Sequence, residues 1–206
     1  MRVALLGGTF DPPHVGHLIA ASDAHDVLAL DRLVFVPAAQ QPLKRNLPVA
    51  AASHRLRMLQ LMIQGDARFS LDEIEIQRTG LSFTVDTLEE YARRLPEAVR
   101  YFLIGADAFA MLDQWRDAPR VVALAHLVVL TRSGGGGGRR DLSADEVSER
   151  VRAIGGNEAA VPQALPARRI DVSSTEIRRR VAARRPIRGF VTDAVAQYID
   201  TNELYR

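Results

Sequence analysis

The chain has 206 residues, an apolar fraction of 47% and a charged fraction of 25%, values typical of a globular protein. It contains no cysteine, which excludes disulfides, thiolate metal sites and thiol catalysis. The net charge is only +2, too small to indicate a nucleic-acid partner, and no apolar run approaches the ~20 residues that span a membrane. Because a core strand is predicted from residue 3, we expect no signal peptide and a cytoplasmic protein.

Apolar runs alternate along the chain with stretches of helical periodicity. Buried strands are predicted at residues 3–6, 33–37, 101–104 and 126–131. A strand with one face exposed to solvent is predicted at residues 69–76, and a short strand at residues 168–172. Helices are predicted from residue 18, over residues 51–63, over residues 84–95, in stretches up to residue 125 and over residues 192–200. In the second of these, Leu56, Leu59 and Ile63 lie on one face. A further helix is predicted after a cap at Ser173 or Ser174.

This alternation predicts an α/β protein with a Rossmann-like, doubly wound and mostly parallel sheet that has helices on both faces. The order of the strands does not follow from the sequence. Residues 133–140 include five consecutive glycines, at residues 134–138, which we expect to form a flexible loop. We treat residues 1–206 as a single domain that contains this loop.

The stretch from Gly7 to His17, Gly-Gly-Thr-Phe-Asp-Pro-Pro-His-Val-Gly-His, joins the first predicted strand to the first predicted helix. A strand, a glycine turn and a helix start direct backbone N–H groups at an anion, usually phosphate. Gly7 and Gly8 would leave no side chain between the backbone and a ligand. His14 and His17 are three residues apart and would share one face of the helix, where they could stabilise a phosphoryl group in transit. A metal-binding pair or a simple helix cap are the alternatives.

Three further segments follow predicted strands, as the first motif does. They are residues 38–44, which include Lys44, the only lysine of the chain, residues 105–107 and residues 173–178. In a doubly wound sheet, ligands bind at the carboxyl ends of the strands, so we expect the four segments to converge on one crevice. Hydroxyls and free N–H groups at the start of the last segment, together with Arg178, suit phosphate oxygens, whereas alone they would indicate only a serine cap and a solvated arginine.

These motifs resemble those of the nucleotidylyltransferases that carry a His-x-Gly-His sequence, and within them most closely the bacterial nicotinate-nucleotide adenylyltransferases. The string Ser-Ser-Thr-Glu-Ile-Arg at residues 173–178 is similar to the second superfamily motif. Thr-Val-Asp-Thr at residues 84–87, and Gly-Ala-Asp at residues 105–107 followed by Trp115, resemble motifs of the nicotinate-nucleotide enzymes. The match departs from the pattern at Leu43, where the family often has histidine before the cation; His54 and Arg55 could compensate, although a solvated helix start is the simpler interpretation.

The resemblance implies transfer of the adenylyl group of ATP to nicotinate mononucleotide, which gives the deamido dinucleotide and pyrophosphate. It implies catalytic roles for His14, His17, Lys44 and Arg178. It implies contacts with ATP for Gly7, Gly8, Thr9, Phe10, His14, Gly16, His17, Ser173, Ser174, Thr175 and Arg178. It implies contacts with the mononucleotide for Thr84, Thr87, Asp107, Trp115 and Arg116.

No carboxylate cluster in the sequence indicates a metal site in the protein, so we expect Mg²⁺ to arrive with ATP. One alternative is a related transferase that acts on pantetheine phosphate or a cytidylyl acceptor, which the Thr84 to Thr87 string and Trp115 argue against. The other is a nucleotide- or nucleic-acid-binding protein that uses the arginines of residues 168–188. Neither a monomer nor a homo-oligomer is favoured.

Overall fold

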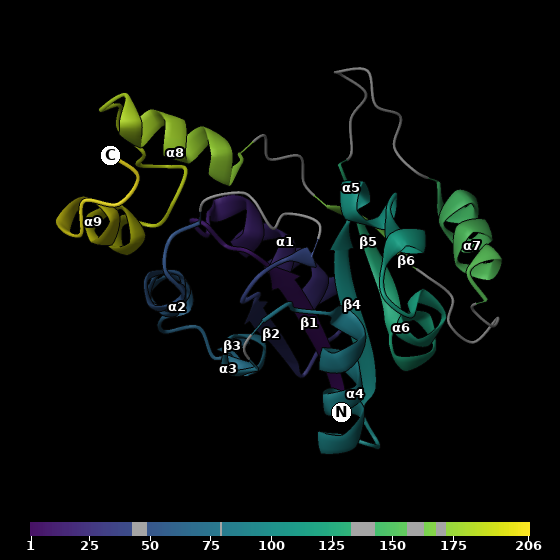
Figure 1. The fold of residues 1–206 in the computed structure, drawn as a ribbon. Coiled ribbons are helices and arrows are strands. Elements are labelled where there is room, and N and C mark those ends of the chain that lie inside the picture. The colour runs from purple at the N-terminus through teal and green to yellow at the C-terminus, as the bar shows by residue number, and fades with distance from the viewer. Residues whose placement is uncertain (43–48, 79, 133–142, 156–162, 168–171) are drawn as a thin grey trace.

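A computed structural model describes the chain except for residues 43–48, 79, 133–142, 156–162 and 168–171. In the described part, six strands form one sheet in which all neighbours are parallel (Figure 1). The strands are β1 (Arg2–Gly8), β2 (Arg32–Pro37), β3 (Phe69–Leu71), β4 (Val99–Gly105), β5 (His126–Arg132) and β6 (Gln163–Ala167). Their order is β3-β2-β1-β4-β5-β6. The predicted Rossmann-like, doubly wound sheet is confirmed, and its order reverses between β1 and β4, the place where such sheets bind ligands.

Helices cover both faces of this sheet (Figure 1). They are α1 (Val15–Val27), α2 (Ala52–Ile63), α3 (Ile74–Gln77), α4 (Thr84–Arg94), α5 (Ala106–Phe109), the 3-10 helix η2 (Leu112–Gln114), α6 (Ala118–Leu124), α7 (Ala144–Ala153), α8 (Ser174–Ala182) and α9 (Asp193–Thr201). Residues of α1, α2, α8 and α9 belong to one apolar core, and residues of α3 to α7 belong to the other.

The alternation of side chains along β1 supplies both cores. Val3 and Leu5 belong to the core under α3 to α7, and Ala4 and Leu6 to the core under α1, α2, α8 and α9. All four are nearly inaccessible to solvent, because β1 lies between β2 and β4 and has helices on both sides. Burying one leucine side chain contributes about 1.5–3 kcal/mol, so this continuous apolar run is what fixes β1 at the centre of the sheet.

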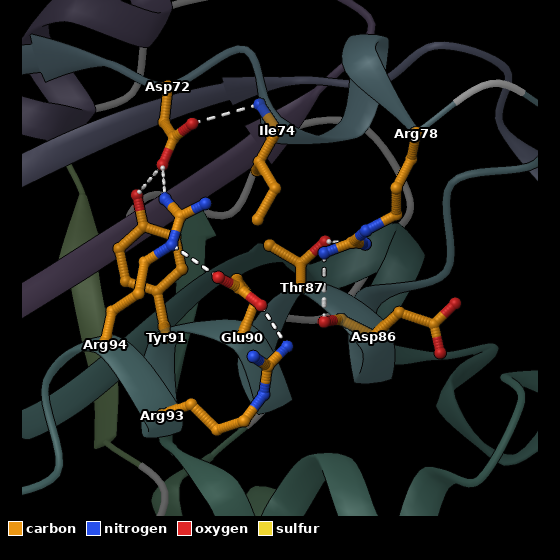
Figure 2. Close-up of polar contacts among 9 residues, drawn as sticks. All are labelled: Asp72, Ile74, Arg78, Asp86, Thr87, Glu90, Tyr91, Arg93 and Arg94. Carbon is orange, nitrogen blue, oxygen red and sulfur yellow. Dashed lines mark hydrogen bonds and ion pairs between the residues drawn. The ribbon is translucent and has the colours of Figure 1, made fainter.

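The strand predicted over residues 69–76 is wrong in its second half, where the chain forms α3. The cause is Asp72, whose carboxylate accepts a hydrogen bond from the backbone N–H of Ile74 at 3.0 Å and turns the chain out of the strand (Figure 2). The other oxygen of Asp72 accepts from the hydroxyl of Tyr91 at 2.7 Å and from Arg94 at 3.0 Å, which ties the end of β3 to α4.

The far edge of the sheet also differs from the prediction. The strand predicted at residues 168–172 falls mainly outside the described residues, as does the glycine-rich loop at residues 133–140. The structure instead has β6 at Gln163–Ala167, whose register pairs Leu130 with Leu165. This strand contains Pro166, which lacks an N–H donor and is tolerated because β6 lies at the edge. No helix among the described residues has the length and apolar composition needed to cross a membrane.

Candidate active site

The loop after β1 begins two residues later than predicted, at Thr9 instead of Gly7. Gly7 and Gly8 both lie within β1, where Gly8 is in register with Pro37 of β2. A Cβ atom on Gly8 would lie 3.0 Å from the ring of Phe10, so the absence of a side chain there lets that ring fold back over the strand. Phe10 itself has a left-handed backbone with φ of 52°, and it is buried. The turn therefore depends on Phe10 as much as on the glycines.

His14 and His17 lie together at the start of α1. His14 caps the helix, and its backbone N–H donates to Nδ1 of His17 at 3.2 Å. The two rings are stacked with 3.7 Å between their centroids, and the edge of Phe10 contacts His17. Burial, and then the neighbouring His14, hold the pKa of His17 well below its ordinary value of 6.5. The ring is therefore neutral near pH 7. Because its Nδ1 accepts, Nε2 carries the hydrogen and can act as a donor.

Helix α8 is fastened to the same loop through its first turn. Ser173 caps α8 by accepting from the N–H of Glu176, and the hydroxyl of Ser174 donates to the carbonyl of Pro12 at 2.9 Å. The guanidinium of Arg178 donates to the carbonyl of Asp11 at 2.6 Å. The two superfamily-type motifs, more than 150 residues apart in the sequence, are thus in direct contact. This brings together the start of α1 and the start of α8, two helix ends that favour anions.

Behind the loop lies a buried cation that the sequence analysis placed wrongly. Arg55 is 1% exposed, and its guanidinium donates to four backbone carbonyls, those of Thr9, Ala38, Ala39 and Ala50, at 2.8 to 3.4 Å. Its burial lowers the pKa of the guanidinium, which stays protonated all the same. The expected solvated helix start is therefore wrong for this residue.

The periodicity of α2 contained the signal for Arg55. The buried residues of α2 are Arg55, Met58, Leu59 and Met62, which follow the spacing of a buried face. Leu56 and Ile63, expected on that face, are only partly buried. His54 points elsewhere, with its Nδ1 3.0 Å from the hydroxyl of Tyr198 in α9.

The residues around His14, His17 and the start of α8 form the first half of the site. The second half surrounds the start of α4. Phe83 caps this helix without a side-chain hydrogen bond to its first turn. The guanidinium of Arg116 lies 4.8 Å from the centre of the Phe83 ring and 3.5 Å from the carboxylate of Asp86. Trp115 precedes it and meets Phe102 of β4 edge to face at 6.1 Å. Arg116 thus lies beside the first turn of α4, which begins at Thr84, while Trp115 contacts the neighbouring strand β4.

Thr87 faces the protein interior. It is 2% exposed, and its hydroxyl donates to Glu75 at 2.7 Å and accepts from Arg78 at 3.1 Å. Arg78 also donates to the carbonyl of Asp86, which holds the first turn of α4 in place (Figure 2). Burial raises the pKa of Glu75, although Thr87 and Ser82 donate to its carboxylate. Thr87 is therefore placed to support this helix start from behind, and sequence reasoning missed Glu75 and Arg78.

Hydrogen bonds join these halves along the carboxyl edge of the sheet. The N–H of Ala39 donates to the hydroxyl of Ser82, and the N–H of Ser82 donates to the carbonyl of Gln40, at 2.9 Å each. The loop after β2 is thereby connected both to Arg55 and to the approach to α4. Asp107 lies exposed in α5, which follows β4, the neighbour of β1. Lys44 lies outside the described residues. Among the described residues, no group of three or more acidic or histidine side chains could hold a metal ion.

The chain is similar along its whole length to proteins of one family. Residues 5–180 match the cytidylyltransferase-like family. A protein of Gemmatimonas aurantiaca named probable nicotinate-nucleotide adenylyltransferase is 45% identical over 206 residues, which are 100% of this chain and 93% of that protein. A protein of the same name from Thermus thermophilus is 41% identical over 100% of both chains. The structure of Plasmodium falciparum nicotinic acid mononucleotide adenylyltransferase complexed with NaAD aligns with a TM-score of 0.75 at 16% identity, covering 99% of this chain and 97% of that one.

The parallel sheet, the paired histidines at its switch point and the family match define a nucleotidyltransferase. The full-length similarity to the two bacterial relatives is more specific than the fold. On this ground the chain belongs to the nicotinate-nucleotide adenylyltransferase family.

Proposed function

We propose that the protein transfers the adenylyl group of ATP to nicotinate mononucleotide in the biosynthesis of NAD. One observation carries the proposal: two different kinds of binding surface lie along one edge of the sheet. The first consists of the paired histidines and the start of α8, and it suits a chain of phosphates. The second consists of the start of α4 with Trp115 and Arg116, and it suits an aromatic ring that carries a carboxylate. We expect the reaction to take place in the cytoplasm.

The phosphate half is assigned to ATP. The backbone of Gly7, Gly8, Thr9 and Phe10 and the small residue Gly16 allow the triphosphate to approach the start of α1. Ser173, Ser174 and Thr175 offer hydroxyls and N–H groups at the positive end of α8, and Arg178 adds a guanidinium that is about one third exposed. Lys44 is assigned to the same phosphates from the sequence alone.

The chemistry needs no nucleophile from the protein. A phosphate oxygen of the mononucleotide attacks the α-phosphorus of ATP, a new P–O bond forms, and the bond to the leaving pyrophosphate breaks. The protein's task is to align two anionic reactants and to stabilise the charge that develops between them. His17 donates from Nε2 toward the α-phosphate, and His14, stacked on it at 3.7 Å, contacts the neighbouring phosphates. The arriving negative charge favours the protonated ring, so the pKa of His17 rises when ATP binds.

The residues around the phosphate half do not fit a metal ion held by the protein. The one carboxylate of the loop after β1 belongs to Asp11, which is 2% exposed and whose Oδ1 accepts from the N–H of Ala50 and the hydroxyl of Tyr205. Mg²⁺ is therefore assigned to the triphosphate itself, and it would screen the charge of the leaving pyrophosphate.

The second half is assigned to the mononucleotide. Trp115 stacks on the pyridine ring, and the uncapped first turn of α4 at Thr84, with Arg116 beside it, binds the pyridine carboxylate. Asp107 is assigned to the ribose phosphate portion. Thr87 acts indirectly, because its hydroxyl is already engaged by Glu75 and Arg78.

The test is release of pyrophosphate from ATP across a panel of acceptors. We expect nicotinate mononucleotide to be the best acceptor, followed by nicotinamide mononucleotide, with pantetheine phosphate inactive. CTP in place of ATP serves as the control for the donor. Release with pantetheine phosphate, or from CTP with a cytidylyl acceptor, and none with the mononucleotide would reassign the enzyme within its superfamily.

A further inference from the structure

Asp11 connects three parts of the ATP half of the site, which is the phosphate half described above. Its carboxylate oxygen Oδ1 accepts from the hydroxyl of Tyr205 at 2.6 Å and from the backbone N–H of Ala50 at 3.2 Å. Its other oxygen, Oδ2, lies 3.9 Å from Nη1 of Arg178. The same Nη1 donates to the backbone carbonyl of Asp11 at 2.6 Å. The guanidinium of Arg178 is thus held by a carbonyl, close to a carboxylate that could attract it further.

Tyr205 reaches Asp11 from a strained segment that follows α9. Glu203 and Tyr205 have left-handed backbones, with φ of 52° and 64°, and so does Phe10 on the opposite side of the contact. Such a conformation costs about 1–3 kcal/mol for a residue other than glycine, and it persists only where the surroundings impose it. The segment is anchored by the N–H of Leu204, which donates to the carbonyl of Ile199 at 3.1 Å. The left-handed backbone of Glu203 and this hydrogen bond end α9 in a Schellman motif, which sets the direction in which the chain continues to Tyr205.

The hydroxyl of Tyr205 remains a donor at every physiological pH. Burial, followed by the adjacent Asp11 carboxylate, raises the pKa of Tyr205 far above its ordinary value of 10.0. The carboxylate therefore always receives a neutral donor from Tyr205 in addition to the N–H of Ala50. These two donors compensate Oδ1 and so reduce the negative charge that draws Arg178 toward Oδ2, a buried atom that accepts no hydrogen bond from the described residues.

We propose that Tyr205 is a positioning residue for ATP. By donating to Asp11, it keeps the carboxylate from drawing Arg178 away from the triphosphate. Without this hydroxyl, the nearest cation with partial exposure, Arg178, would close the distance of 3.9 Å and form a direct ion pair with Asp11. Less of the guanidinium would then face the phosphates. This inference rests on the assignment of Arg178 to ATP.

The test is Tyr205→Phe, compared with Tyr91→Phe as a matched control. Tyr91 also donates to a carboxylate, that of Asp72 at 2.7 Å (Figure 2). It belongs to the last two turns of α4, which contain none of the residues assigned to ATP. Both variants lose one hydroxyl and keep the ring, and both should lower the melting temperature by a few degrees. We expect Tyr205→Phe to raise the dissociation constant and KM of ATP roughly 3- to 30-fold and to leave KM of the mononucleotide within about twofold. Tyr91→Phe should change neither.

A double-mutant cycle identifies the route of the effect. In an Arg178→Ala background, Tyr205→Phe should cause no further weakening of ATP binding, because there is no guanidinium left to misplace. Equal changes in KM for both substrates, an unchanged affinity for ATP, or additive effects in the cycle would each overturn the inference. Both variants are assayed well below their melting temperatures, where nearly every molecule is folded, because an unfolded fraction in equilibrium would raise the apparent dissociation constant of either substrate. Wild-type enzyme that fails to transfer the adenylyl group would instead contradict the proposed function.

Discussion

Replacing Arg55 by methionine should destabilise the protein strongly, because the guanidinium is the common donor to backbone carbonyls from three segments. Methionine fills much of the same volume but has no donor. Three of the four carbonyl contacts are at 3.1 Å or less, and the fourth is at 3.4 Å. Leaving one buried acceptor without its partner costs about 1–3 kcal/mol, and four carbonyls lose the same donor here.

We therefore expect Arg55→Met to lower the free energy of unfolding by about 3–5 kcal/mol, which corresponds to a fall of roughly 6–20 °C in melting temperature for a domain of this size. Urea denaturation followed by circular dichroism measures the change. Arg57→Met is the control, since Arg57 is exposed on the same helix and, within the described part of the chain, its guanidinium donates only to Gln60, at 3.4 Å. It should change stability by less than about 0.5 kcal/mol.

Arg55→Lys should recover little of the loss. Lysine offers one ammonium group, which cannot span carbonyls that the planar guanidinium contacts along two edges. A difference of less than about 1 kcal/mol between Arg55→Met and Arg57→Met would refute the argument. It would mean that Thr9, Ala38 and Ala39 find water or other donors when the guanidinium is removed.

The remaining predictions concern His17 and the choice of acceptor. His17→Ala should lower kcat about 10²–10³-fold with little change in mononucleotide affinity, and a near wild-type kcat would remove His17 from the chemistry. Since the pKa of His17 is depressed in the folded state, the unfolded chain binds more protons below pH 6.5, so stability should fall on acidification below that pH. Urea unfolding at pH 7.5 and 5.5 should show a smaller loss for His17→Gln than for wild type, and equal losses would contradict the burial of a neutral ring. Finally, kcat/KM should favour the acid mononucleotide over its amide; Trp115→Ala should weaken both alike, and Thr84→Pro, which removes an N–H donor from the first turn of α4, should reduce the preference.

The central strands could be predicted because they are buried on both faces, and such burial requires an almost entirely apolar sequence. A run such as Val3 to Leu6 is apolar on both faces, and only a strand between two helical layers buries all of it. β6 was not predicted, because Gln163–Ala167 contains a proline and small residues, which do not indicate a strand. An edge strand tolerates them. The helix α3 was not predicted because it begins where the N–H of Ile74 donates a hydrogen bond to the carboxylate of Asp72. This single contact outweighs the alternating pattern of the sequence.

The motifs of the candidate site could be predicted from the sequence, but the residues that hold those motifs in place could not. Gly7 to His17 and residues 173–178 are recognisable as strings, and the structure brings them into contact through Ser174 and Arg178. Their supporting residues have no such signal. Arg55 resembles any arginine at a helix start until its position on the buried face of α2 is considered. The bond from Tyr205 to Asp11 joins residues separated by 194 positions, and no local pattern contains it.

That separation has a consequence for how the protein is made. At a synthesis rate of about 5–20 residues per second, the ribosome delivers Tyr205 roughly 10–40 s after Asp11. The first strand and its loop can pair with β2 and β4 much earlier in synthesis, because those strands are complete by Gly105. Until Tyr205 is synthesised, a nascent chain therefore carries the loop after β1 without the hydrogen bond from that hydroxyl to Asp11. On the role proposed for Tyr205, the chain reaches its full affinity for ATP only after this residue has been added and has folded back onto the loop.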